Sequence, residues 1–401
     1  MSGVAGRHVV LGVSGGIASY KACVVARRLT EAGATVDVVM TAAATEFVRP
    51  LVFEALTGRP VGVSLWEPGC ALDHVRLGRE ADLVVVAPAT ARLLARAAQG
   101  VADDLLTALL LACRAPILLC PAMNDRMYEH PETQRNVRTL EERGVNLLGP
   151  DVGPLARGEG EGPGRMVEPE TIVAHVERLL RADAPFTGRH VVVTAGPTRE
   201  QLDPVRVVTN RSSGRMGFAL ARSAWLRGAD VTLIAGPTTL PAPTGVDVVR
   251  IETTAELQAA VEIALPSADL LLMAAAPADY RPARSAASKT PRVEGPLQVA
   301  FEPTPDILVT TKESRKPGAL IVGFALETGD SVTKARAKLR RKQLDLVVAN
   351  DAAEEGAGPE VETNRVTLVA PGGETVLPLM AKDEVAEAIL DKVAELLARR
   401  A

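Results

Sequence analysis

Two glycine-containing turns in this chain follow runs of aliphatic residues and have the composition of phosphate-binding turns. Residues 8–13 lead into a turn that starts at Ser14, and residues 190–194 lead into a turn around Gly196. At such a strand-to-helix turn, glycine lets the backbone amides approach a phosphate, and the helix N-terminus favours the anion. Glycines in α/β turns also occur for packing alone. The turns therefore indicate two possible phosphate sites, of which the first has a hydroxyl donor in Ser14.

Neither turn is followed by the acidic residue that dinucleotide-binding folds place at the end of the second strand, where it binds the adenosine ribose. In the first half this strand ends at Met40 and Thr41, and Asp37 lies inside it. In the second half the corresponding strand ends near Ala235. NAD is therefore disfavoured in both halves, and a mononucleotide suits the first turn better.

The first half contains two further polar residues of interest, His74 and Asn124. Asn124 follows a predicted strand at 116–120, at the edge of the sheet where α/β folds bind ligands. Its amide can donate to a carboxylate, or it can cap a turn. A lone histidine such as His74 can act as a general base, but it is at least as often structural.

The second half carries a polar loop, residues 210–217, directly before a predicted helix. Its amides and serine hydroxyls suit an anion at a helix N-terminus, whereas a simple serine cap would explain only one serine. Asp279 follows a buried strand and can hold Mg²⁺ on a triphosphate or cap a turn. Lys289 lies in an irregular segment, and Lys338 and Lys342 share one helix face. Each of these lysines can be solvated or can contact phosphates.

Strand and helix patterns alternate along the whole chain, which is typical of parallel sheets flanked by helices. The sequence therefore predicts an α/β protein with two Rossmann-like three-layer domains, residues 1–182 and 186–401, joined by a linker near 182–185. A segment without periodicity, 281–300, interrupts the second domain. The predicted strands lie at 8–13, 35–40, 83–87, 116–120, 145–148, 190–194, 231–235, 247–251, 269–274, 319–324 and 345–349, and the predicted helices at 17–32, 91–99, 103–112, 169–181, 218–226 and 383–399.

The composition narrows the class of protein. The chain has 401 residues, 47% hydrophobic and only 3% aromatic, so the cores should be aliphatic. A net charge of −4, with the basic residues spread out, argues against nucleic-acid binding, which needs a basic face and stacking aromatics. We expect no leader segment and no membrane span, because no apolar run is long enough. The scattered Cys23, Cys70, Cys113 and Cys120, the last within a predicted core strand, indicate neither disulfides nor a zinc site, so we expect a cytoplasmic protein.

Stretches of the first half together resemble the FMN-dependent phosphopantothenoylcysteine decarboxylases, and stretches of the second half resemble the phosphopantothenate–cysteine ligases. The first set comprises residues 14–18, 74, 87–90, 121–124 and 162–166. The second set comprises residues 194–200, 203–206, 210–217, 305–308, 322–325 and 344–351. Their order matches the bifunctional bacterial enzymes of coenzyme A synthesis, and the resemblance covers nearly the whole chain.

The resemblance implies a flavodoxin-like flavoprotein domain followed by a CTP-binding ligase domain. The ligase would activate 4′-phosphopantothenate with CTP and Mg²⁺, giving an acyl-cytidylate and pyrophosphate, and then condense it with cysteine. The flavin domain would use FMN to decarboxylate the product to 4′-phosphopantetheine. The resemblance also implies a homo-oligomer, with trimeric flavin domains and dimeric ligase domains.

The family pattern also implies roles for individual residues. His74 would act as the base, and Asn124 would bind the substrate carboxylate. Asn210 would handle the acyl-cytidylate, Lys289 would neutralise charge during activation, and Asp279 would hold the metal. FMN would be bound by Ser14, Gly15, Gly16, Ile17, Thr41, Pro88, Ala89, Thr90 and Met123. CTP would be bound by Gly196, Ser212, Ser213, Gly214, Ala275, Asp279, Lys289, Pro305, Asp306, Ile307, Phe324, Lys338 and Lys342.

The chain departs from the family pattern at three places. The loop at 155–161 lacks the cysteine that protonates the enethiolate in many decarboxylases, Arg215 stands where a lysine is usual, and Pro277 where a valine is usual. The missing cysteine leaves open a ligase whose flavin domain is catalytically impaired, structural or regulatory. A phosphatase regulator and a flavodoxin-like electron carrier are further alternatives. The intact ligase motifs disfavour the regulator, and the pairing of His74 with Asn124 disfavours the carrier.

Overall fold

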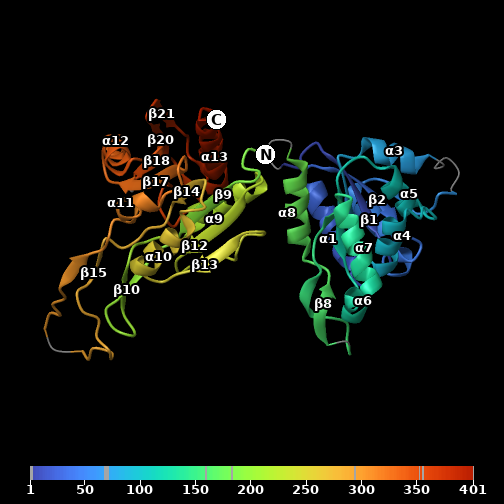
Figure 1. The fold of residues 1–401 in the computed structure, drawn as a ribbon, viewed down its shortest axis with the longest axis horizontal. Helices are drawn as coiled ribbons and strands as arrows, with labels where there is room; N and C mark the ends of the chain where they lie inside the picture. Colours follow the sequence, from blue (N-terminus) through green and yellow to red (C-terminus); the bar gives the residue numbers. More distant parts are fainter. Residues whose placement is uncertain are drawn as a thin grey trace. The chain divides into compact units, whose positions relative to one another are not determined.

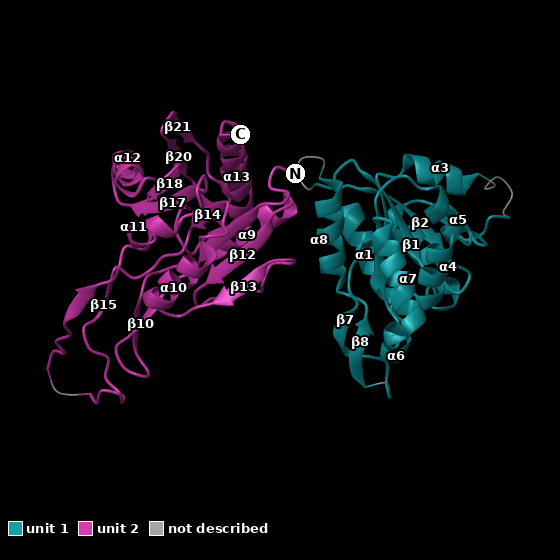
Figure 2. Cartoon of the chain, in the orientation of Figure 1, with its two compact units in different colours: residues 1–182 teal, residues 183–401 magenta. Residues whose placement is uncertain are grey.

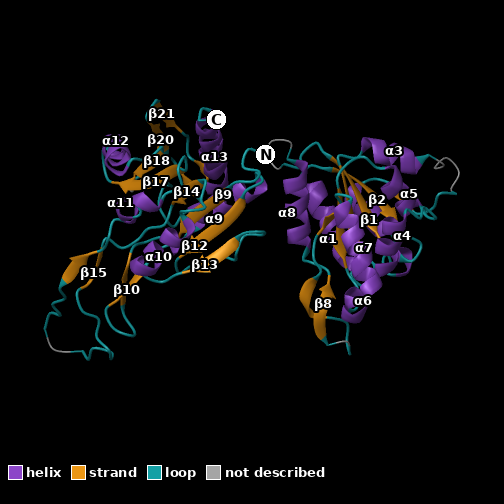
Figure 3. Ribbon diagram, in the orientation of Figure 1, coloured by secondary structure: helices purple, strands orange, loops and turns teal. Residues whose placement is uncertain are grey.

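The structure is a computed structural model that describes residues 3–66, 72–158, 160–181, 184–292, 295–351, 353–354 and 356–400. It divides into two compact units, residues 1–182 and 183–401 (Figure 2). Each unit has a largely parallel sheet with helices packed on both faces (Figures 1 and 3). The α/β architecture predicted from the alternation of strand and helix patterns is therefore confirmed.

Six parallel strands form the sheet of the first unit, in the order β3-β2-β1-β4-β5-β6. The strand order reverses between β1 and β4, and α/β folds bind ligands at such a switch point. Helices cover both faces, which explains why the central strands are nearly continuous runs of Val, Leu and Ile. The strands are β1 (His8–Val13), β2 (Thr35–Met40), β3 (Val61–Gly62), β4 (Leu83–Ala89), β5 (Ile117–Pro121) and β6 (Asn146–Leu147).

Alternate residues of these strands enter two aliphatic cores. Val9 and Leu11 of β1 belong to one core, and Val10 belongs to the other. The helices that supply the first core are α1 (Ser19–Glu31), α2 (Pro50–Thr57) and α8 (Pro169–Leu180). The helices that supply the second core are α3 (Asp73–Glu80), α4 (Ala91–Gln99), α5 (Leu105–Ala112) and α7 (Pro131–Glu142). The short helix α6 (Asp125–Glu129) contacts β8 (Glu161–Arg165), which forms a hairpin with β7 (Asp151–Pro154).

The sheet of the second unit has the order β13-β12-β9-β14-β17-β18-β20-β21. Its first six strands are parallel and repeat the order of the first unit, so the switch point lies between β9 and β14; β20 and β21 are antiparallel additions. The strands are β9 (His190–Ala195), β12 (Asp230–Ala235), β13 (Asp247–Arg250), β14 (Leu270–Met273), β17 (Leu320–Glu327), β18 (Leu346–Asp351), β20 (Thr367–Ala370) and β21 (Gly373–Val376).

Helices cover both faces of this second sheet as well. On one face, α10 (Thr254–Ala264), α11 (Ile307–Thr310) and α12 (Ser331–Lys342) contribute Leu257, Ile307 and Leu339 to the core. On the other face, α9 (Arg215–Leu226) packs on β9, and α13 (Lys382–Ala398) packs chiefly on α9. We expected the C-terminal helix to lie on the sheet. It covers α9 instead, because α9 has apolar residues on its outer side as well.

Three two-stranded ribbons complete the second unit: β10 (Arg199–Gln201) with β11 (Val207–Thr209), β15 (Tyr280–Pro282) with β16 (Phe301–Pro303), and β19 (Thr363–Asn364) with β22 (Met380–Ala381). The segment predicted to be irregular, 281–300, is bounded by β15 and β16 and has no helix or strand between them among its described residues (Figure 1). The N–H of Ala286 donates to the carbonyl oxygen of Leu202 (3.0 Å), which ties the segment to the β10–β11 turn.

Gly217 allows α9 to approach the end of β9. A Cβ at this position would lie 2.8 Å from the carbonyl oxygen of Thr194, which is too close for any real side chain. We expect Gly217→Ala to lower the free energy of unfolding of this unit by about 1–3 kcal/mol, as overpacking does elsewhere. Urea denaturation of the full chain measures it. Gly372→Ala is the control, since a Cβ there meets no atom within 4 Å; equal losses in both variants would contradict this explanation.

Candidate active sites

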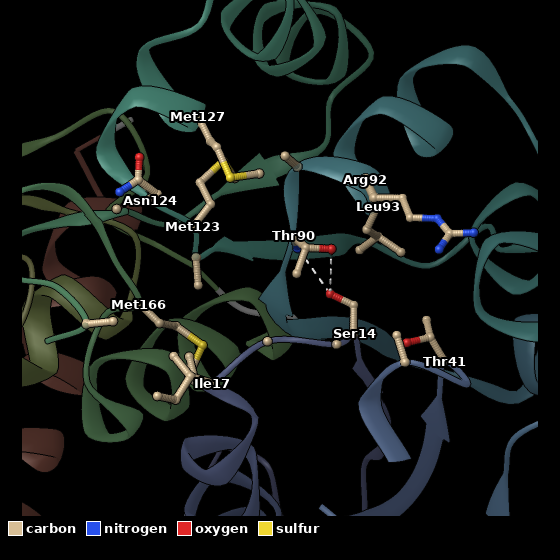
Figure 4. A pocket seen from close by; sticks show the side chains of 18 of the residues that line it. Ser14, Ile17, Thr41, Thr90, Arg92, Leu93, Met123, Asn124, Met127 and Met166 are labelled. Atoms are coloured by element: carbon tan, nitrogen blue, oxygen red, sulfur yellow. Dashed lines mark hydrogen bonds between the residues drawn. The ribbon is translucent and has the colours of Figure 1, made fainter. Parts of the chain in front are cut away.

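A cavity of about 870 Å³ lies at the switch point of the first unit, beyond the carboxyl ends of β1, β4 and β5 (Figure 4). Its walls come from the turns after these strands, from the loop after β2 and from residues of the β7–β8 hairpin and its connections. The volume lies within the range of small-molecule and cofactor sites. The predicted FMN residues that line it are Ser14, Gly15, Gly16, Ile17, Thr41, Thr90 and Met123.

Ser14 ties together the turns after β1 and β4. Its Oγ donates to the carbonyl oxygen of Pro88 (2.8 Å) and accepts the backbone N–H of Thr90 (3.1 Å; Figure 4). The residue is only 2% exposed. Pro88 and Ala89, also predicted to bind FMN, do not line the cavity. They end β4, and Pro88 acts on the site through the carbonyl oxygen that orients Ser14.

Close packing of two loops explains why the turn after β1 needs glycine. A Cβ at Gly15 would lie 2.7 Å from the backbone carbonyl carbon of Ala43, in the loop after β2. Without a side chain at this position, the two loops can touch. Their contact allows Ser14 and Thr41, one from each loop, to line the same cavity.

Asn124 and His74 are not brought together within the chain. Asn124 lines the cavity, and its Oδ1 also accepts the N–H of Arg126 (3.0 Å), so it caps α6 as the simpler interpretation predicted. His74 is the second residue of α3 and does not line this cavity. Its Nδ1 is buried and has no hydrogen-bond partner among the described residues. His74 therefore does not share the cavity that Asn124 lines.

Several lining residues were not found by sequence reasoning, most notably Lys21. This lysine is buried in α1, and its Nζ donates to the carbonyl oxygen of Met166 (2.9 Å) and to Glu168 Oε1 (3.1 Å). It thereby fixes the segment after β8 against α1. A lysine within an apolar helix face was the available signal. The other lining residues that the sequence analysis missed include Arg92, Leu93, Met127 and Met166 (Figure 4).

The loop that lacks the family cysteine borders this cavity. Leu155 and Ala156 line it, and the N–H of Leu155 donates to the carbonyl oxygen of Gly160 (3.0 Å). Cys120 is fully buried in β5, and burial raises the pKa of its thiol. Its assignment to the core is therefore confirmed, and Cys120 is unsuited to donate the proton in place of the missing cysteine. Cys70 lies outside the described residues.

A second cavity, of about 1010 Å³, lies at the carboxyl ends of β14, β17 and β18 in the second unit. The predicted nucleotide residues that line it are Ser212, Gly214, Ala275, Asp279, Pro305, Asp306, Ile307, Phe324, Lys338 and Lys342, together with Asn210. Gly196, Ser213 and Lys289 do not line it. Gly196 lies next to the lining residue Gly214, where a Cβ would be in ordinary contact with the Gly196 backbone (3.5 Å). Ser213 donates to the carbonyl oxygen of Pro359 (2.7 Å).

Lys338 and Lys342 face this cavity rather than solvent. Lys338 Nζ donates to the carbonyl oxygen of Phe324, and Lys342 Nζ donates to Asp306 Oδ1 (2.8 Å). Burial, together with the positive charge of Lys342, lowers the pKa of Lys338 to about 8. The cavity thus holds a cation whose charge is easily gained or lost near physiological pH.

Asn210 and Lys289 differ in their relation to the cavity. Asn210 Nδ2 donates to the carbonyl oxygen of Pro277 (2.8 Å), so it joins the loop before α9 to the end of β14. Lys289 is exposed on the segment between β15 and β16. Its neighbour Thr290 donates its N–H to Asp203 Oδ2 (3.2 Å). The β10–β11 turn therefore fixes the backbone beside Lys289, and the lysine lies away from the cavity of its own chain.

The described part of the chain has no preformed metal site made of protein ligands alone. Among the described residues there is no group of three or more His, Cys, Asp or Glu able to hold a metal. Asp279, the predicted metal ligand, is exposed at the rim of the second cavity. Mg²⁺ is usually bound by one or two carboxylates with substrate phosphates and water, so a single carboxylate beside a nucleotide suits it.

Comparison with known proteins decides the family. A family model described as "Flavoprotein" matches residues 3–181, and one described as "DNA/pantothenate metabolism flavoprotein C-terminal domain" matches residues 186–397. The coenzyme A biosynthesis bifunctional protein CoaBC of Mycobacterium tuberculosis is 49% identical over 408 residues, covering 98% of this chain and 97% of the relative. The chain belongs to the family of coenzyme A biosynthesis bifunctional proteins. The resemblance inferred from the sequence motifs is thereby confirmed.

Other relatives agree with this family. The bifunctional protein CoaBC of Vibrio cholerae is 46% identical over 399 residues, covering 98% of this chain and all of the relative. Similar solved structures include the C-terminal domain of a CoaBC protein (37% identity, 54% of this chain, all of that chain, TM-score 0.47). They also include a PPC decarboxylase mutant complexed with pantothenoylaminoethenethiol (32% identity, 42% of this chain, 96% of that chain, TM-score 0.38). No helix within the described ranges has the length and apolarity needed to span a membrane.

The lowered pKa of Lys338 makes a pH dependence testable by isothermal titration calorimetry with CTP. Above pH 8 this lysine loses its charge in the free protein, so the dissociation constant should rise about tenfold between pH 7 and pH 9. Lys338→Met should weaken CTP binding at pH 7 and reduce the pH dependence. Lys334→Met, which removes a more exposed lysine from the same helix, should retain the pH dependence of CTP binding. A dissociation constant that is equal at both pH values in the unmodified protein would contradict the assignment.

Proposed function

We propose that this chain catalyses two consecutive steps of coenzyme A biosynthesis. The second unit condenses 4′-phosphopantothenate with cysteine at the expense of CTP, and the first decarboxylates the resulting 4′-phosphopantothenoylcysteine to 4′-phosphopantetheine with FMN. The observation that carries this proposal is the 46–49% sequence identity with bifunctional relatives, which covers 98% of the chain. Each of the two units also has a cavity at the carboxyl ends of its parallel strands. A cytoplasmic homo-oligomer, with trimeric flavin domains and dimeric ligase domains, is part of the proposal.

In the ligase step, a carboxylate oxygen of 4′-phosphopantothenate attacks the α-phosphorus of CTP. The bond from this phosphorus to the bridging oxygen breaks, and pyrophosphate leaves with the electron pair. The amine of cysteine then attacks the acyl carbon, CMP leaves, and the nitrogen loses a proton. Negative charge that develops at phosphorus must be stabilised by fixed positive groups, which is the main contribution that a protein makes to such a transfer.

The lining residues of the second cavity match these needs. Lys338 and Lys342 supply positive charge beside Phe324, where the nucleotide is proposed to bind. Asn210, which donates to the carbonyl oxygen of Pro277, would contact the acyl-cytidylate. Asp279 would hold Mg²⁺, which would neutralise phosphate charge. Lys289 would be brought to the cavity of a partner copy, since it is remote from its own.

The first cavity fits FMN. The turn at Ser14, with the hydroxyl groups of Thr41 and Thr90, suits the phosphate, and the apolar walls, which include Ile17 and Met123, suit a planar ring system. When bound, FMN supplies a reversible two-electron acceptor, which makes the oxidised substrate prone to lose CO₂. Asn124, which lines the cavity, would bind the carboxylate. His74, contributed by a neighbouring copy in the trimer, would take the proton from the thiol of the substrate.

Mass spectrometry of the products formed from 4′-phosphopantothenate, cysteine, CTP and Mg²⁺ tests both steps. The mass of 4′-phosphopantetheine shows that both units work and that the absent loop cysteine is dispensable. Accumulation of 4′-phosphopantothenoylcysteine would instead support a ligase with an impaired flavin domain. Absence of both products would contradict the proposed function.

Two variants should separate the steps. Asn210→Ala should slow condensation about 100-fold or more, the usual effect of losing one donor to a developing charge, while added 4′-phosphopantothenoylcysteine is still decarboxylated. His74→Gln should have the opposite effect, so that 4′-phosphopantothenoylcysteine accumulates at a normal rate. Coupled assays of pyrophosphate and CO₂ release measure the two steps separately. Loss of both activities in either variant, with the fold intact, would contradict the division of labour.

A further inference from the structure

Three segments of the second unit meet in the wall of the cavity: the loop before α9, residues 356–364, and the start of α13. They share one acceptor, the carbonyl oxygen of Pro359. Ser213 Oγ donates to it (2.7 Å), and so does Lys382 Nζ (3.1 Å). This junction places Lys382 in the cavity wall.

Lys382 is a buried cation without a counter-ion. The residue is only 6% exposed, and its Nζ donates to the carbonyl oxygens of Gly358 (3.2 Å) and Pro359. An ammonium group has three N–H donors, and the third has no acceptor within the described part of the chain. No described carboxylate pairs with it either. Burial and the charge of Arg215 lower its pKa to about 8, as expected of a cation that lacks an anion.

Asn364 supplies a second unsatisfied group in the same wall. The residue is 7% exposed, lies on β19 and lines the cavity. Its Oδ1 is buried and has no hydrogen-bond partner among the described residues. A buried amide oxygen without a hydrogen bond is unfavourable. Such an oxygen in a cavity wall therefore indicates that a ligand or a water molecule donates a hydrogen bond to it.

The surroundings of these two residues favour an anion. Arg211 and Arg215 also line the cavity, and α9, a helix of 12 residues, begins at Arg215. The only carboxylate recorded within ion-pair distance of Arg215 in the described part of the chain is Glu362, at 3.4 Å and largely exposed. The helix N-terminus and the arginines add positive potential to that of Lys382.

We propose that Lys382 and Asn364 form the subsite for the pyrophosphate end of CTP, which becomes the leaving group. This inference rests on the proposed ligase function. Lys382 would donate its third N–H to a phosphate oxygen, and the Asn364 amide oxygen would accept from a water molecule on the phosphate-bound Mg²⁺. When the bond to the α-phosphorus breaks, the departing oxygen keeps the electron pair, and the positive charge of Lys382 stabilises it.

The choice of pyrophosphate over the phosphate of 4′-phosphopantothenate follows from position. Ser213 lies between Ser212 and Gly214, which line the cavity and are proposed to bind the nucleotide. Because Ser213 and Lys382 donate to the same carbonyl oxygen, the nucleotide-binding loop lies beside Lys382. The 4′-phosphate is the alternative, and kinetics with separate substrates distinguish the two.

Two variants test the subsite, with calorimetry of magnesium pyrophosphate and initial-rate kinetics as readouts. Asn364→Asp keeps the shape but adds a negative charge, and should weaken pyrophosphate binding about tenfold or more. Lys382→Met should lower kcat/KM for CTP by about 10–100-fold, with Lys382→Arg partly restoring it. The KM values for 4′-phosphopantothenate and cysteine should stay within about twofold of the unmodified protein. Lys392→Met, on the same helix but outside the cavity, is the matched control.

The possible results separate this inference from the proposed function. Unchanged pyrophosphate binding in Asn364→Asp and Lys382→Met, with an unfolding temperature near that of Lys392→Met, would overturn it. An effect confined to the KM for 4′-phosphopantothenate would also overturn it. If Lys382→Met fails to fold, Asn364→Asp and Lys382→Arg decide. An unmodified protein that binds magnesium pyrophosphate but forms no product would refute the ligase function and leave the subsite standing.

Discussion

The structure depends on how closely backbones approach one another at the two switch points. In the first unit, a side chain at Gly15 would collide with Ala43; in the second, one at Gly217 would collide with Thr194. These contacts allow turns from different strands to lie close together, and in the first unit they allow Ser14 and Thr41 to line one cavity. A parallel sheet has all its strand ends on one edge, so the constraint falls at the same place in both units.

Buried lysines recur as the means of fixing these walls. Lys21, Lys338 and Lys382 each donate to a backbone carbonyl oxygen of a segment distant in sequence. A carbonyl satisfies an ammonium without neutralising it, so the positive charge remains available to a ligand while the loop is held. An ion pair with a carboxylate would fix the loop equally well but would cancel the charge. Among the described residues, Glu168 is the one carboxylate that forms an ion pair with any of these three lysines, and its partner is Lys21.

The sequence predicted the strands of the two parallel sheets except β3, because helices on both faces leave a continuous aliphatic run. It did not predict β20, β21 or the short strands of the two-stranded ribbons, which lack such a run. It also predicted most lining residues that follow a strand directly, such as Ser14, Thr41 and Asp279, because a strand end determines its own position in a parallel sheet. It did not find Lys382 or Asn364, since each reaches the cavity only through contacts between segments far apart in the chain. His74 and Lys289 were recognised as motif residues, but no local pattern showed that they lie outside the cavities of their own chain.

The position of Lys289 has a consequence for how the protein behaves in dilute solution. The lysine sits on an exposed segment fastened at Asp203 and Leu202, away from the cavity beside Asp279. If two copies must meet to complete each ligase centre, the specific activity is a property of the population rather than of one molecule. It then falls as the protein is diluted below the concentration at which copies associate, and an excess of an inactive copy with an intact Lys289 sustains the activity of a copy that lacks it.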